Sequence, residues 1–179
     1  MSRQYFEDLL VDPPTLNPLA AAIVATTETQ LWPAASYTPI NIGDIRPGKV
    51  YKVQAGGIMS TNTSGTLIIT PRIGLLVAGI TMGANAAVNV PVSLTGVPWF
   101  LDFTCIIRTV GLAGVNSTAI GNGRFVGPGT GAVGTALSFA FGGTSATFDA
   151  SIAEGLTFGW TLSVAGSCTP EWVTMQSLN

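Results

Sequence analysis

The carboxylates are the residues of this chain that come nearest to a catalytic set. Nine Asp and Glu residues are present, and histidine is absent. Without histidine, Ser-His-Asp catalysis, Cys-His catalysis and every histidine-ligated metal site are excluded. Two facing carboxylates would still suffice for glycoside hydrolysis. The candidates for such a pair are Asp102, Asp149, Glu154 and Glu171.

The positions of these carboxylates do not favour catalysis. Asp102 and Asp149 lie on the polar side of alternating segments, which predicts that both point into solvent. Solubility and turn chemistry account for such residues. A calcium site built from Asp149, Glu154 and loop carbonyls would lack the dense acidic spacing of calcium loops. We therefore predict no catalytic residue, no metal and no cofactor, and a protein that is not an enzyme.

Residues 129–134 read Gly-Thr-Gly-Ala-Val-Gly and match the G-x-G-x-x-G pattern of dinucleotide-binding loops. That chemistry needs a strand before the glycines and a helix after them. Here Gly127-Pro128 precedes the match, and the strand-like segment 137–141 follows it. In a chain with 22 glycines such a match arises by chance. We interpret the segment as a loop.

The four tryptophans could stack on a sugar. Trp99 and Trp160 fall on the apolar side of alternating segments, so we predict that they pack in the core. Trp32 and Trp172 flank the domain and are better candidates for an interface. A sugar-binding surface is the alternative interpretation of these aromatic residues.

Composition limits the classes of partner. The chain has 179 residues, enough for one domain with a core. Only 9% of its residues are charged, against about 25% in an ordinary soluble domain. The net charge of −2 and the scattered basic residues predict no nucleic-acid partner. The longest apolar segments, 19–25 and 73–82, are shorter than the roughly 20 residues of a spanning helix, so we expect no membrane partner.

From residue 31 onward, apolar and polar residues alternate in short segments, as in half-buried β-strands. In segment 49–55, Tyr51, Val53 and Ala55 share one side. Similar alternation occurs in segments 66–73, 99–111, 137–141, 147–152 and 156–164. About eight strands separated by Gly, Asn and Pro turns predict an all-β, antiparallel sandwich. The predicted core residues are Tyr51, Val53, Leu67, Ile69, Trp99, Leu101, Phe103, Phe139, Phe148, Phe158, Trp160 and Leu162.

Glycines are expected to interrupt this pattern. Gly56-Gly57 is predicted to end the strand that begins at Lys49. Gly121-Asn122-Gly123 and Gly127-Pro128-Gly129 are predicted to form turns.

Residues 1–30 differ from the rest of the chain, because they combine acidic residues with three prolines. We predict an extended arm or a short helix over residues 5–10, with Ser2 as its cap and Pro13-Pro14 as its end. The arm is too short to fold alone, so we expect it to pack on the domain at 31–179, on a sister subunit or on a larger partner.

The outward sides of the predicted strands carry Thr, Ser, Ala and Gly rather than Lys and Glu. Interfaces between subunits are depleted in charge in the same way. We therefore predict a symmetric oligomer. The two cysteines, Cys105 and Cys168, could form a disulfide, although two reduced thiols are the simpler interpretation.

A longer pattern resembles a known family. It consists of 47–57, followed by Met59-Ser60-Thr61, 66–74, Val97-Pro98-Trp99, 108–111 and 156–163. In this order the segments resemble the jelly-roll virion proteins of tailed bacteriophages, which are capsid decoration (cement) or minor structural proteins with a tumour-necrosis-factor-like fold. The resemblance covers roughly residues 30–179.

The resemblance implies an eight-stranded antiparallel jelly roll that forms a homotrimer. Such a protein is made in the host cytoplasm and stabilises the virion by binding the major capsid protein, or another virion protein, on the capsid surface. The arm would supply the contact. The alternative within the family is a receptor-binding, glycan-binding module at a tail or fibre tip. The candidate capsid contacts are Tyr5, Phe6, Leu9, Leu10, Leu16, Leu19, Ile23 and Trp32.

Overall fold

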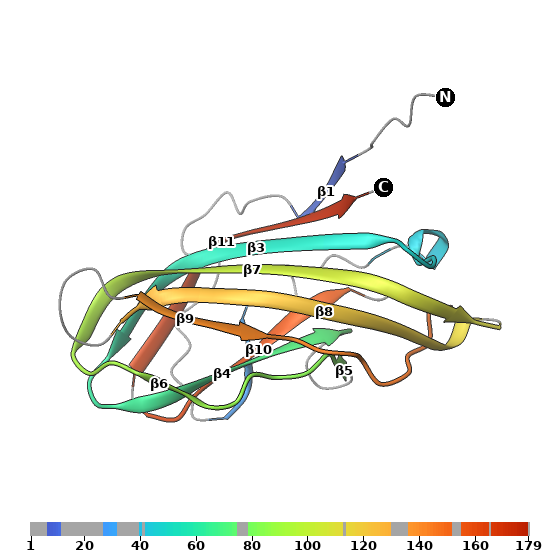
Figure 1. Cartoon of the computed structure of the whole chain (residues 1–179). Coiled ribbons are helices and arrows are strands. Elements are labelled where there is room, and N and C mark those ends of the chain that lie inside the picture. The colour runs from blue at the N-terminus through green and yellow to red at the C-terminus, as the bar shows by residue number, and fades with distance from the viewer. Residues whose placement is uncertain are drawn as a thin grey trace.

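The structure, a computed structural model, is an antiparallel β-sandwich of two facing sheets (Figure 1). The predicted all-β class is therefore confirmed. The described part of the chain contains eleven strands and one short 3-10 turn at Ile42–Asp44. The residues that the structure describes are 7–11, 27–31, 40, 42–74, 79–112, 114–129, 136–151, 155–164 and 166–178.

The larger sheet has six strands, all antiparallel to their neighbours. In spatial order they are β1 (Glu7–Val11), β11 (Gly166–Leu178), β3 (Val50–Thr61), β7 (Leu94–Gly111), β8 (Gly114–Pro128) and β9 (Ala136–Phe141). The smaller sheet has five strands. They are β2 (Thr29–Gln30), β10 (Leu156–Leu162), β4 (Gly65–Ile73) and β5 (Ile80–Thr81), with β6 (Val88–Val90) also paired to β4.

The chain crosses repeatedly between the two sheets. The order β1-β11-β3-β7 in one sheet faces the order β2-β10-β4-β5 in the other. This is jelly-roll connectivity, and the β8 and β9 strands extend it beyond β7. The described residues form eleven strands, more than the sequence-based figure of about eight, although segment 137–141 did predict β9.

The core fills the space between the sheets. Of the predicted core residues, all but Phe139 are buried, and Phe139 packs partly buried against the core from the edge strand β9. Rings from the two sheets meet there. The Trp99 and Trp160 rings lie 5.3 Å apart, and the edge of one ring meets the face of the other between Phe103 and Phe158, at 5.1 Å.

The turn predicted at 121–123 lies within strand β8, and so do Gly127 and Pro128 of the second predicted turn, so the prediction was wrong for these residues. Gly121 and Gly123 alternate with Asn122 and point toward the core. A β-carbon at Gly121 would collide with the Phe103 ring, and one at Gly123 would collide with the rings of Phe141 and Phe103. These glycines therefore serve as spacers that admit aromatic rings.

The predicted break at Gly56-Gly57 is also wrong, because β3 continues to Thr61. A β-carbon at Gly56 would collide with the Trp172 indole, and one at Gly57 would meet the backbone of the neighbouring strand β11. The register of β11 against β3 shifts at this point, between Pro170 and Trp172. The glycines permit that close approach.

Segment 147–152 was predicted to be a strand, and its described part is not one. Phe148 forms an isolated bridge with Ser117, and Ser145 exchanges hydrogen bonds with Ala119. The segment follows β8 through these separate contacts rather than through a continuous ladder. Residues 152–154 lie outside the described residues.

The start of the chain forms a strand where a short helix over residues 5–10 was considered. β1 pairs with β11, with Glu7 opposite Leu178 and Leu9 opposite Gln176. The helix is therefore wrong for residues 7–10, because the backbone groups of β11 provide an antiparallel ladder. Leu9 and Leu10 lie in β1. The other candidate arm contacts, Tyr5, Phe6, Leu16, Leu19, Ile23 and Trp32, lie outside the described residues.

Candidate functional site: the outer face of the six-stranded sheet

The outward side chains of β3, β7, β8 and β9 form level rows, because the register places them directly opposite one another. We name each row by its central pair on β7 and β8. The isoleucine row contains Val50, Ile106 and Ile120; the polar row Lys52, Thr104 and Asn122; the charged row Gln54, Asp102, Arg124 and Ala140; and the phenylalanine row Gly56, Phe100, Val126 and Ser138.

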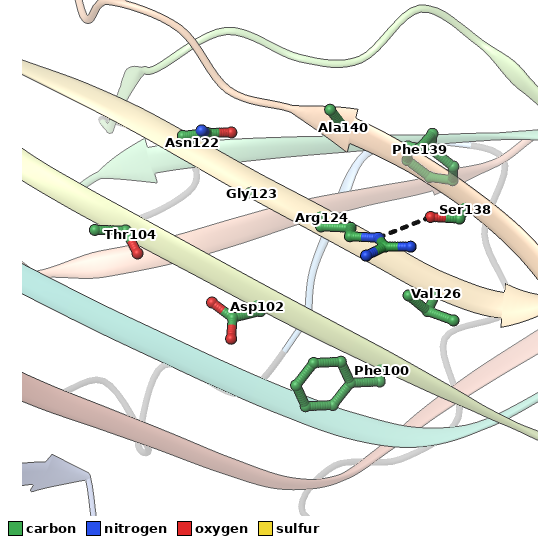
Figure 2. A pocket seen from close by; sticks show the side chains of 10 residues that line it. All are labelled: Phe100, Asp102, Thr104, Asn122, Gly123, Arg124, Val126, Ser138, Phe139 and Ala140. Atoms are coloured by element: carbon green, nitrogen blue, oxygen red, sulfur yellow. Dashed lines mark hydrogen bonds between the residues drawn. The ribbon is translucent and has the colours of Figure 1, made fainter.

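An open groove of about 710 Å³ lies across β7, β8 and β9 on this face. It combines hydrogen-bonding side chains with apolar ones, as Figure 2 shows. Its lining residues are Phe100, Asp102, Thr104, Asn122, Gly123, Arg124, Val126, Ser138, Phe139 and Ala140.

Asp102 is held by its own sheet. Its carboxylate accepts a hydrogen bond from Gln54 Nε2 at 3.0 Å, and its Oδ2 lies 3.4 Å from Lys52 Nζ. Both partners belong to β3, and Figure 2 shows the carboxylate turned toward that side. The prediction that Asp102 lies on the outer face of its strand is confirmed.

Arg124 stands directly opposite Asp102 in the register but turns away from it. Its Nε donates to Ser138 Oγ at 2.9 Å on the neighbouring strand β9. Among the residues that the structure describes, no carboxylate lies within 4.0 Å of this guanidinium. An arginine presents five N–H donors. Arg124 uses one of them, Nε–H, to bond Ser138, and its two terminal NH2 groups (the outer fork) face the groove.

Apolar side chains border the polar part of the face. Ile106 and Ile120 are 39% and 38% exposed on one side of it. On the other side the Phe100 and Trp172 rings lie 5.9 Å apart. Leu112, at the turn between β7 and β8, is 95% exposed. Trp172, which the sequence marks as an interface candidate, is therefore part of the outer face.

The four candidate carboxylates lie in separate places. Asp102 is on β7, Glu171 is on β11, and Glu154 lies outside the described residues. Asp149 is in the segment after β9, where hydrogen bonds from the Ser151 hydroxyl and amide lower its pKa. Within the described ranges, no group of three or more Cys, Asp or Glu side chains is placed to hold a metal ion.

Both cysteines are buried and free. Burial raises the pKa of the Cys105 thiol to about 12, and its Sγ lies 3.7 Å from Met82 Sδ. Burial also raises the pKa of Cys168, against the opposing effect of a hydrogen bond with Trp99. Both groups are therefore protonated, unreactive core residues at neutral pH.

Sequence reasoning found Asp102 and missed Arg124 and Asn122 as surface groups, because residues 121–123 were interpreted as a turn. The signal was present. Phe125 continues the inward side of Gly123 and Gly121 at a spacing of two residues, which places Asn122 and Arg124 on the opposite side.

No family model and no curated protein sequence matches this chain. The described part of the chain also contains no helix long and apolar enough to cross a membrane.

Proposed function

We propose that this chain is a structural virion protein that decorates a bacteriophage capsid and stabilises the shell, acting as a trimer and without enzymatic activity. The observation that carries the proposal is a jelly roll whose outward strand sides carry few charges. Ile106 and Ile120 are exposed there, and Leu112 is exposed at the turn between β7 and β8. The family resemblance over residues 30–179 supports the same function.

The proposed mechanism is mechanical. Each copy makes modest contacts, and the contacts of a symmetric oligomer act together on a repeating lattice. Many such contacts oppose the outward pressure of packaged DNA. A surface with few charges loses little on burial, since few ionised groups must be desolvated.

The arm is the proposed capsid contact, and its apolar residues Leu16, Leu19 and Ile23 are the ones to change. Complete removal of residues 2–29 would also remove β1 and Glu28, which bonds to Arg72. The triple variant Leu16→Asp, Leu19→Asp, Ile23→Asp leaves those contacts in place. It tests the arm without dismantling the sheet edge.

The experiment is co-sedimentation with empty shells assembled from the major capsid protein of the same genome. The wild-type chain is expected to saturate the shells, and the triple arm variant is expected to bind about tenfold or more weakly. The matched control places three Asp residues at the exposed positions Thr81, Ala86 and Asn89 and should bind normally. Failure of the wild-type chain to bind overturns the proposal. Normal binding of the arm variant overturns the role of the arm.

The groove supports a second candidate, a glycan-binding module at a tail or fibre tip. Asp102, Asn122 and Arg124 offer planar hydrogen-bonding groups beside Phe100, a combination that suits a polyhydroxylated ligand. A glycan array distinguishes the two functions. Binding that is lost in the Asn122→Ala variant, by a chain that ignores capsid shells, would favour the second candidate.

A further inference from the structure

We propose that copies of this chain meet through the outer face of the six-stranded sheet, with Asp102 of one copy facing Arg124 of the next. This inference rests on the self-assembly part of the proposed function and names the surface that performs it. The partner that covers this face is a second copy of the chain.

The row geometry is the first argument. Facing sheets pack with their strands nearly aligned, and a symmetry axis parallel to the strands keeps each row level with the same row on the neighbouring copy. If β7 of one copy lies over β8 of the next, each row then meets its own complement. The isoleucine row brings Ile106 against Ile120, and the polar row brings Thr104 against Asn122.

Charge is the second argument. In this arrangement the charged row brings Asp102 of one copy to Arg124 of the next. Within one chain these side chains are opposite in register but turned apart, toward Gln54 and Ser138. The outer fork of Arg124 therefore keeps its donors free for a carboxylate from outside, and Asp102 has a second oxygen, Oδ1, to offer.

Side-chain size is the third argument. The strand next to β8 carries Ala140 and Ser138 at the outward positions of the charged and phenylalanine rows. In the proposed contact these small residues face β3 of the other copy, where Gln54 projects at the charged row. The large Gln54 side chain thus meets the small Ala140, and Phe100 meets Val126. The phenylalanine row borders the ion pair directly on one side, and on the other side the isoleucine row lies beyond the polar row.

The experiment measures mass by light scattering over a dilution series, with Arg124→Asp, Asp102→Arg and the double variant. Each single reversal places like charges opposite one another and is expected to weaken association about thirtyfold or more. The double variant restores opposite charges and should regain most of the association. Asn89→Asp, an exposed change on the five-stranded sheet, is the matched control and should leave the mass unchanged.

Arg124→Asp is the decisive variant. It removes one bond to Ser138 and no ion pair within the described residues, so its fold should survive. Circular dichroism checks that survival. Unchanged association of both folded single variants overturns this inference, as does loss of association without rescue in the double variant. Capsid-shell binding is measured separately and tests the proposed function. If the wild-type chain binds shells but both single variants associate as strongly as the wild type, the proposed decoration function stands and this interface is refuted.

Discussion

Two outward-facing arginines, one on each sheet, have opposite surroundings. Arg72 on β4 donates through Nε and Nη2 to the two oxygens of Glu28, at 3.0 Å and 2.7 Å, and through Nη1 to the Gly79 carbonyl. Arg124 on β8 donates to one serine hydroxyl. Near Arg72 the outward-lying Thr70 and Thr157 are buried. Ile106 and Ile120, which point outward from the other sheet, remain over a third exposed.

The contrast indicates where the fold is complete within one chain. On the five-stranded sheet the outward Arg72 is paired with Glu28, just before β2, so its charge is neutralised within the same chain. The six-stranded sheet presents an open groove lined by Arg124 and, beside it, Ile106 and Ile120, which are over a third exposed among the described residues. Buried polar groups need partners and exposed ones tolerate water. The open face is therefore the one that can exchange water for a partner.

The largest expected effect is unfolding of the whole sandwich at high pH, which abolishes both outer faces. Tyr51, Cys105 and Cys168 are buried groups whose pKa is raised in the folded protein, mainly by burial. A raised folded-state pKa contributes stability that is complete below the unfolded pKa and is lost as pH rises through the folded value. For Cys105 that window runs from pH 9.0 to about 12.

Urea unfolding at several pH values, followed by tryptophan fluorescence, measures this loss. We expect the midpoint to fall steadily above pH 9 and the chain to unfold without denaturant near pH 12. Cys105→Ala should make the fall less steep. A midpoint that stays constant up to pH 12 would contradict the burial of these groups.

Phe103→Ala should have the next largest effect, because this ring joins the two sheets. It stacks on Phe141 at 5.8 Å and meets the edge or face of Phe158 at 5.1 Å across the core. Its loss should reduce the free energy of unfolding by about 3–5 kcal/mol. The adjacent outward change, Thr104→Ala, should stay within about 0.5 kcal/mol. Equal effects of the two variants would refute the distinction between inner and outer faces.

The inner face was more predictable from the sequence than the outer one. Alternation alone identified β3, β4, β7, β9 and β10, because large apolar residues recur every second position there. It failed for β8, where the inward positions 121 and 123 are glycines that make room for rings contributed by β7 and β9. It also failed for β11, whose register shifts between Pro170 and Trp172. Neither cause is local to its own segment.

The candidate site could be predicted only in part for the same reason. The outward position of Asp102 follows from the alternation of its own strand. Its hydrogen bond with Gln54 joins residues 48 positions apart, and the position of Arg124 opposite it depends on the pairing of β7 with β8. Register between strands is set by the whole sandwich rather than by a single segment.

Arg72→Met tests the closed face and should cost about 1–2 kcal/mol of unfolding free energy, because Glu28 loses its partner while only 30% exposed. This loss should be independent of protein concentration. Lys52→Met is the matched control on the open face. The Lys52–Asp102 pair is about a third exposed on both sides, so its loss should cost less than about 0.5 kcal/mol. Thermal melts of both variants measure these losses, and a larger loss in Lys52→Met than in Arg72→Met would contradict the prediction.

Arg124→Met should have the smallest effect on the isolated chain, within about 0.5 kcal/mol, because it removes one exposed hydrogen bond. Its effect should grow with protein concentration, since association stabilises the folded state by mass action. The wild-type melting temperature should therefore rise on concentration, and that of Arg124→Met should rise less, whereas Arg72→Met should rise in parallel with wild type. If Arg124→Met instead follows wild type at every concentration, the two arginines are equivalent, and the contrast between an open and a closed face loses its meaning.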